Sequence, residues 1–122
     1  MRYSNWILLF LAFACAGEAR LKGFDNQGWQ DDRMGCQSKR LTLIDDLMAR
    51  KSEITGLGQE EISKLLGKPD QHELSSRNKK SFTYFLAQGP GCPNAVDNPP
   101  KLIIRFDGLG RSKDIIYYKL AE

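Results

Sequence analysis

The residues with the most specific chemistry in this chain are its three cysteines, Cys15, Cys36 and Cys92. An odd number of cysteines in an exported protein implies that one thiol has a separate fate, such as lipidation. If Cys15 carries lipid, Cys36 and Cys92 remain as a pair, and we expect them to form a disulfide in an oxidising compartment. Because that bond would close a long loop, it would stabilise the fold by roughly 4 kcal/mol. Their spacing is not that of a CxxC redox motif.

The N-terminus predicts that the protein is exported. An apolar run at residues 6–14 follows Arg2 and stops at Cys15. The run is too short to span a bilayer as a mature helix, so residues 1–14 are predicted to be a signal peptide. Residues 11–15, Leu-Ala-Phe-Ala-Cys, are similar to a bacterial lipobox, in which a small residue precedes the cysteine that is acylated and becomes the new N-terminus.

The residues alone leave more than one processing route open. Ala12-Phe-Ala14 also satisfies the small-x-small rule of ordinary signal peptidase, and cleavage after Ala16 would equally leave one pair of cysteines. If Cys15 is acylated, two or three acyl chains would hold the protein firmly on a membrane. Ala16 stands where an aspartate commonly retains lipoproteins in the inner membrane. We therefore expect an outer-membrane lipoprotein facing the periplasm, with a soluble periplasmic or secreted protein as the alternative.

The composition describes a single small domain behind the signal. The chain has 122 residues and a net charge of +3. Residues 15–28 contain few apolar side chains and are predicted to be a flexible tether, and residues 29–122 are predicted to be one domain. The basic cluster of Arg77, Lys79 and Lys80 is expected at the exposed tip of a hairpin. Without a dense basic stripe that includes aromatic residues, the sequence does not predict nucleic-acid binding.

The ionisable residues form no catalytic or metal-binding motif. His72 is the only histidine and the cysteines are far apart in sequence, which argues against a zinc site. The acidic doublet at Asp45 and Asp46 would diverge by about 100° on a helix, so its carboxylates would not converge on one substrate. We therefore expect no metal, no cofactor, no small-molecule substrate and no enzymatic activity. A small enzyme that uses His72 is the least favoured interpretation.

Two helices are predicted from the spacing of apolar residues. The first spans residues 38–50, and its apolar face consists of Leu41, Ile44, Leu47 and Met48. The second begins after Gly58, has acidic residues in its first turn, and ends at Gly67 with Pro69 beyond it. Its apolar stripe consists of Ile62, Leu65 and Leu66.

Strands are predicted in the C-terminal half, at residues 71–75, 81–87, 101–106 and 112–118. Polar and glycine-rich turns separate the members of each pair, which predicts two hairpins. The fold class is therefore α+β, with two short helices packed on one face of a small antiparallel β-sheet, in the order α-α-β-β-β(-β).

Tyrosines within the predicted strands are the candidate interface residues. Tyr84, Tyr117 and Tyr118 have apolar neighbours, a pattern that usually reflects packing within a sheet. If their side chains are exposed, they are natural anchors for a protein partner, because aromatic residues dominate binding hot spots.

The order of several short motifs resembles that of a known family. Segment 55–70, TGLGQEEISKLLGKPD, is followed by Tyr-Phe-Leu at 84–86 and by IRFDGLGR at 104–111. This arrangement is similar to the SmpA/OmlA (BamE-like) outer-membrane lipoprotein domain family, whose fold is shared by the β-lactamase inhibitor protein. The resemblance covers roughly residues 56–116. It implies the same α+β fold and a scaffold or inhibitor that binds proteins without performing chemistry.

Together these features predict an exported, lipid-anchored envelope lipoprotein that acts as a non-catalytic protein-interaction module. Its partner would be another envelope protein, and its role would be to support outer-membrane assembly or integrity. The alternative is a secreted or periplasmic inhibitor, or an immunity-like protein, that binds a hydrolase.

Overall fold

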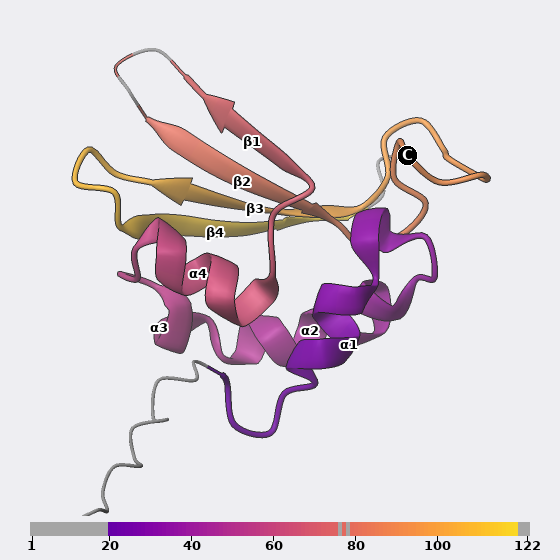
Figure 1. The fold of residues 1–122 in the computed structure, drawn as a ribbon, viewed down its shortest axis with the longest axis horizontal. Helices are drawn as coiled ribbons and strands as arrows, with labels where there is room; N and C mark the ends of the chain where they lie inside the picture. Colours follow the sequence, from indigo (N-terminus) through magenta and orange to yellow (C-terminus); the bar gives the residue numbers. More distant parts are fainter. Residues whose placement is uncertain (1–19, 76, 78, 120–122) are drawn as a thin grey trace, which may run out of the picture.

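A computed structural model describes residues 20–75, 77 and 79–119 of the chain (Figure 1). The predicted signal peptide and the predicted lipidation residue Cys15 lie outside the described residues. The helices come first in the chain: α1 (Asn26–Asp31), the 3-10 helix η2 (Arg33–Gly35), α2 (Lys39–Ala49), α3 (Lys51–Ile54) and α4 (Gln59–Leu66). The strands follow: β1 (Gln71–Leu74), β2 (Lys80–Phe85), β3 (Lys101–Phe106) and β4 (Ser112–Tyr118). This order confirms the predicted α+β class.

The four strands form one antiparallel sheet in the order β1-β2-β3-β4, so each strand pairs with its neighbour in sequence. Both predicted hairpins are present, and β3 and β4 have the predicted bounds. Asp107 begins the turn between them, because its Oδ1 accepts hydrogen bonds from the N–H groups of Leu109 (2.9 Å) and Arg111 (3.1 Å). These two bonds lower the pKa of the Asp107 carboxyl. Gly110 completes the turn with a φ of 82°, which favours glycine.

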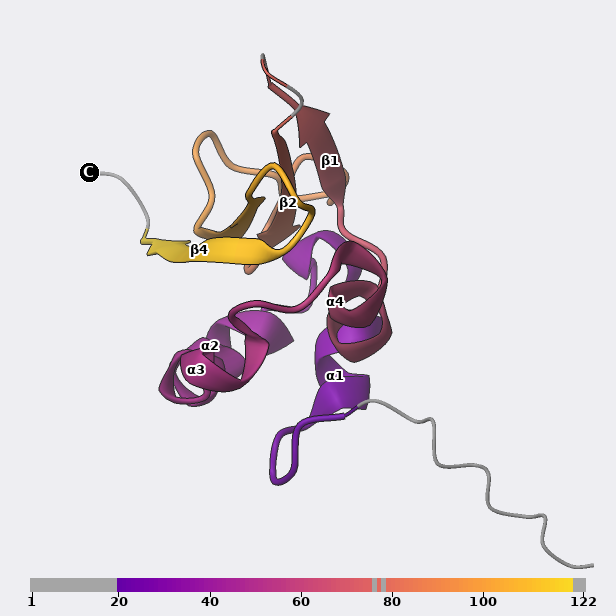
Figure 2. The same cartoon turned by 90° about the vertical axis from the view of Figure 1, so that its left-hand side faces the viewer.

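The helices cover one face of the sheet and bury it (Figure 2). Alternate residues of a strand point to opposite faces, and the register places Tyr84, Leu102 and Tyr117 side by side on the helix-covered face. The buried hydrophobic residues of β2, β3 and β4 on this face are Phe82, Tyr84, Leu102, Ile104, Phe106 and Ile115. They belong to one hydrophobic core with the helical residues Trp29, Ile44, Leu47, Ile54, Ile62, Leu65 and Leu66.

Helix α4 agrees with its prediction at both ends. Glu61 accepts a hydrogen bond from the N–H of Gly58 (2.8 Å), which is half of a capping box. The predicted stripe of Ile62, Leu65 and Leu66 is buried. The helix ends at Gly67, whose φ of 82° is costly for other residues. Local signals therefore defined this helix correctly.

Helix α2 has the predicted position, and the predicted Ile44, Leu47 and Met48 lie in or against the core, but Leu41 does not. Leu41 is 39% exposed, whereas Arg40 is fully buried beside Ile44 and Leu47. The sequence predicted Leu41 on the core face and made no prediction for Arg40. Arg40 is buried because it has a buried acidic partner from the sheet side of the molecule, Asp70.

Segment 20–28, which the sequence predicts as part of a tether, is packed onto the domain. Leu21 and Phe24 are 5% and 6% exposed and belong to the hydrophobic core. The ring centroid of Phe24 lies 6.1 Å from that of Trp29. Two apolar residues create no helical or strand period, so their burial could not be inferred from the pattern. The packed domain therefore begins at Leu21 instead of residue 29.

Two aspartates satisfy amide groups at the starts of the first helices. Asp25 accepts a hydrogen bond from the N–H of Gly28 (2.9 Å) at the start of α1. Asp32 is 2% exposed and accepts from three amides around the start of α2, those of Gln37, Lys39 and Arg40. Because the free N–H groups of a helix start need partners, these carboxylates fix where both helices begin.

Candidate functional site

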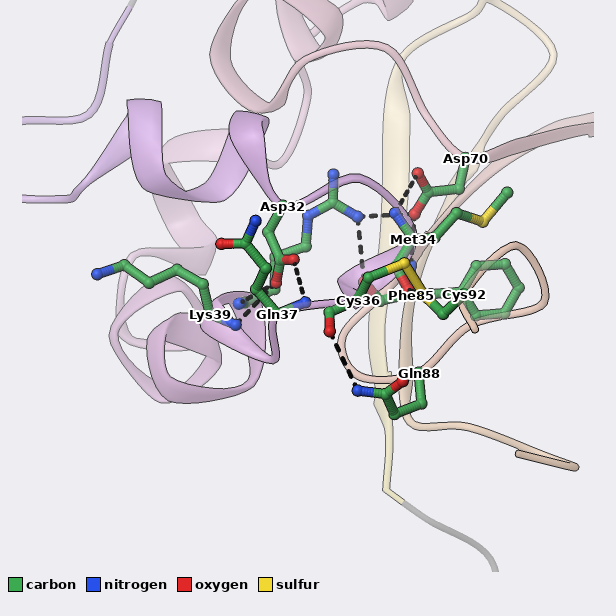
Figure 3. The surroundings of a disulfide bond; sticks show 10 residues. Asp32, Met34, Cys36, Gln37, Lys39, Asp70, Phe85, Gln88 and Cys92 are labelled. Atoms are coloured by element: carbon green, nitrogen blue, oxygen red, sulfur yellow. Dashed lines mark hydrogen bonds and ion pairs between the residues drawn. A yellow bond between two sulfur atoms is a disulfide. The ribbon is translucent and has the colours of Figure 1, made fainter. Parts of the chain in front are cut away.

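The predicted disulfide is present between Cys36 and Cys92 (Figure 3). Their Cα atoms are 5.3 Å apart, and the bond joins the residue after η2 to the loop that follows β2. Beside it, the amide N–H groups of Gln88 and Gly89 donate to carbonyl oxygens of η2 at 3.0 and 2.9 Å. The disulfide and these two bonds fix the loop against the helical layer.

A buried ion pair joins Arg40 to Asp70, and Asp70 lies close to the disulfide in Figure 3. The distance from Arg40 Nη1 to Asp70 Oδ2 is 2.7 Å, and both side chains are at most 1% exposed. The N–H groups of Phe85 (2.8 Å) and Met34 (3.1 Å) also donate to the Asp70 carboxylate. Arg40 Nε donates to the carbonyl oxygen of Trp29 at 2.8 Å. The pair therefore joins α1, η2, α2 and β2.

Two aromatic rings enclose the Arg40 guanidinium. Its central carbon lies 5.4 Å from the ring centroid of Trp29 and 5.5 Å from that of Tyr84. Such cation–π contacts add to the ion pair in holding the desolvated cation. Because all of these groups are buried, the cluster stabilises the fold and presents nothing to a ligand. Sequence reasoning missed it, although Arg40, Ile44 and Leu47 have the i, i+4, i+7 spacing of one helix face.

The three tyrosines predicted as interface anchors do not share a surface. Tyr84 is fully buried, and its hydroxyl donates to the carbonyl oxygen of Gly67 at 2.8 Å. Burial, together with the negative charge of Asp70, raises its pKa, although the positive charge of Arg40 partly offsets this rise. Tyr117 is half-buried against the same core. Only Tyr118, which is 39% exposed, lies on the other face of the sheet.

None of the described helices covers this other face, which we term the open face (Figure 2). The strand register arranges its residues on β2, β3 and β4 in three rows. The middle row is Thr83, Ile103 and Ile116; one end row is Phe85, Lys101 and Tyr118, and the other is Ser81, Arg105 and Asp114. The two isoleucines of the middle row are half-buried and face away from the helices.

The disulfide-linked loop closes one end of the open face. Phe85 lies on this face but is only 4% exposed. A Cβ atom at Gly89 would come within 2.8 Å of the Phe85 Cβ, so the loop backbone packs directly on this ring. A glycine is therefore required at position 89, and the disulfide holds the loop in place over Phe85.

A groove of about 470 Å³ forms the opposite end of the open face. Its lining includes Ile103 from the apolar middle row and charged side chains of both signs, among them Glu73, Lys79, Arg105, Lys113 and Asp114. Protein-binding surfaces typically have an apolar centre and a polar rim, with tyrosine and arginine contributing most of the affinity. The open face has this composition, with Tyr118 at one end and Arg105 at the other.

Other candidate sites have less support. His72 is exposed, and its ring contacts the edge of Phe82 at a centroid distance of 4.9 Å. Within residues 20–119, apart from 76 and 78, no three histidine, cysteine, aspartate or glutamate side chains gather as metal ligands would. In the same part of the chain, no helix has the length and hydropathy needed to span a membrane.

Comparison of the chain with models of known protein families, with curated proteins and with solved structures gives no match. The resemblance to the SmpA/OmlA family therefore stays a prediction that rests on the motifs alone. The function has to be argued from the geometry of the open face.

Proposed function

We propose that the protein is an exported, lipid-anchored module that binds another envelope protein through the open face of its sheet, without catalysis. The observation that carries this proposal is the half-buried apolar pair of Ile103 and Ile116, which lies between Tyr118 and Arg105 on the face that no described helix covers. When one face of an antiparallel sheet contacts only solvent, the residues on that face are usually polar. Two outward isoleucines flanked by residue types common in hot spots favour a protein partner.

The course of the chain supports an arrangement in which a lipid anchor and the open face do not interfere. The described chain starts beside the helices, on the side of the molecule away from the open face (Figures 1 and 2). Cys15 precedes the buried Leu21 by 21 − 15 = 6 positions, a stretch that reaches at most about 21 Å. A lipid on Cys15 would hold the helical side near the membrane and direct the open face into the periplasm.

Site-specific photo-crosslinking in cells would test the binding face. A photoreactive phenylalanine analogue would replace Tyr118, and the matched control would carry it at the exposed Asp45 on α2. We expect one discrete adduct from position 118 only, and we expect Arg105→Glu to weaken it at least tenfold. Equal adducts at both positions, or none at position 118, would contradict the proposal.

The anchor is tested separately by the intact mass of the protein taken from the membrane fraction. We expect a chain that begins at Cys15 and carries glyceryl-linked acyl groups, and we expect Cys15→Ser to release the protein from the membrane. An unmodified chain in the soluble fraction would contradict lipidation and leave the binding face untouched.

A second candidate function, inhibition of an exported hydrolase, is favoured by the loop beside the open face. Four of the five prolines of the chain lie in this loop, at Pro90, Pro93, Pro99 and Pro100. Prolines and a disulfide reduce the freedom that a loop loses on binding, which favours tight complexes. This function predicts a soluble chain and inhibition of a co-secreted hydrolase that is lost in the variant Val96→Asp, because Val96 is 47% exposed in the loop.

A further inference from the structure

Strand β1 is one edge of the sheet, and among the described strands it pairs only with β2. The N–H of Ser75 donates to the carbonyl oxygen of Lys79 at 2.7 Å. Since peptide groups alternate in direction along an antiparallel strand, this bond indicates that residues 71 and 73 also face β2. His72 and Leu74 therefore direct their N–H and C=O groups toward the open edge. The edge offers two donors and two acceptors for an added strand.

The side chains of these two edge residues line two separate grooves. His72 pairs with Phe82, and both lie on the helix-covered face of the sheet. Near β1, however, the sheet extends beyond the helices, so His72 is exposed and Leu74 is 63% exposed (Figure 1). A groove of about 780 Å³ separates α4 from β1, and His72, Phe82, Lys64 and Lys68 contribute to its lining. The inward side chains of a fifth strand would enter this groove.

The edge of β1 is short and carries the charge of Glu73, but it lacks three other features that usually block strand addition. It contains no proline or lysine, and its pairing with β2 has no register shift. The β4 side of the sheet differs, because the β3–β4 pairing shifts between Arg105 and Phe106 and an isolated bridge joins Gly58 to Arg111 just before β4. Of these two edges, β1 is the better template for a partner strand.

The charges around β1 differ between its two sides. On the groove side, Lys64 and Lys68 are exposed, and the carboxylates that share the groove lining with them are those of Glu60 and of Asp70, which is already paired with Arg40. On the other side of the strand, Glu73 is exposed, and the groove that it lines carries charges of both signs. Like charges opposite one another in a sheet are destabilising. A partner strand is therefore favoured when its carboxylates point into the groove.

We propose that β1 binds an extended, acidic peptide segment of a partner protein as a fifth strand, with alternate carboxylates directed at Lys64 and Lys68. Main-chain hydrogen bonds to His72 and Leu74 supply affinity, and the charge pattern supplies specificity and register. This site lies on an edge of the sheet and does not depend on the function proposed for the open face.

Nuclear magnetic resonance of the labelled, non-lipidated variant Cys15→Ser provides the test. The probe is a blocked heptapeptide in which glutamate alternates with threonine, and the matched control peptide has lysine in place of glutamate. We expect the glutamate peptide to shift the amide signals of His72 and Leu74 and to slow their hydrogen exchange. The lysine peptide should bind at least tenfold more weakly, and the double variant Lys64→Glu/Lys68→Glu should lose binding to the glutamate peptide.

A pair of substitutions at one position separates hydrogen bonding from side-chain contact. Leu74→Pro removes an edge donor and should weaken binding at least tenfold, whereas Leu74→Ala keeps the donor and should stay within threefold of the parent protein. Proline is tolerated at strand edges, and unchanged signals from β3 and β4 would show that the variant is folded.

Three results would overturn the proposal. The first is that the glutamate peptide moves neither edge amide at about 1 mM, the weak end of the affinity scale. The second is that the lysine peptide binds the parent protein, or that the Leu74→Pro variant binds the glutamate peptide, as tightly as the parent protein binds the glutamate peptide. The third is that the edge signals change with protein concentration alone, which would show that a second copy of this chain occupies the edge.

Discussion

Arg40 and Asp70 lie thirty residues apart in sequence, yet Arg40 Nη1 is 2.7 Å from Asp70 Oδ2 in the interior. The pair links α2 to the segment that enters β1, so it fixes the helical layer on the sheet. Because both side chains are desolvated, each depends on the other and on its backbone partners. This relationship explains why an arginine occupies a buried position in the first turn of α2.

Removing the acidic partner should therefore be costly. Asp70→Ala leaves the Arg40 cation buried without its partner, and we expect the free energy of unfolding to fall by about 3–5 kcal/mol. The matched control, Asp45→Ala, removes an exposed carboxylate and should stay within about 0.5 kcal/mol of the parent protein. Urea denaturation measures both changes. A loss below about 1 kcal/mol in Asp70→Ala would show that the pair does not hold the layers together.

The disulfide should contribute a similar amount. Cys36 and Cys92 are 56 positions apart, and a loop of that length corresponds to about 4 kcal/mol in the chain-entropy model. The double variant Cys36→Ala/Cys92→Ala should unfold at correspondingly lower urea concentration. The ring of Phe85 should also become more accessible, because its covering loop is released. Identical denaturation curves for oxidised and reduced parent protein would refute this prediction.

Tyr84 should make the fold sensitive to alkaline pH. Its pKa is raised above the ordinary value of 10.0 by burial. Its stabilising contribution is therefore fully present below about pH 10, the pKa in the unfolded chain, and is lost as the pH rises towards the higher folded pKa. Denaturation between about pH 9 and pH 11 should show a steeper decline in the parent protein than in Tyr84→Phe. At neutral pH that variant should lose about 1 kcal/mol with its hydrogen bond to Gly67. Equal slopes would argue that another group controls the decline.

The N-terminal segment should behave as part of the core. Phe24→Ala removes a ring that is 6% exposed, and we expect a loss of about 3 kcal/mol or more. Lys22→Ala is a matched control in the same segment, because Lys22 is exposed and its substitution should change stability by less than about 0.5 kcal/mol. If both variants unfold at the same urea concentration as the parent protein, the segment is a tether after all. Thermal or urea denaturation decides between the two.

The sequence was sufficient for features that depend on neighbouring residues. The bounds of β3 and β4, the turn at Asp107 and the ends of α4 follow from alternation, helical spacing and caps, and each involves residues within a few positions of one another. The disulfide was also predicted from the sequence, because setting Cys15 aside leaves Cys36 and Cys92 as a pair. These features depend on nearby residues or on the number of cysteines, so they can be predicted without knowledge of the fold.

Only the tertiary structure decided which side chains face solvent. Tyr117 and Tyr118 must point to opposite sides of β4, but the position of the helices determines that Tyr117 meets the core and Tyr118 the open face. Likewise Arg40 is buried because it pairs with Asp70, which is thirty residues away in sequence, and Phe24 is buried because it packs against Trp29 and the core. Burial is a property of contacts between distant segments, and a single residue type or a short pattern cannot encode the partner it will meet.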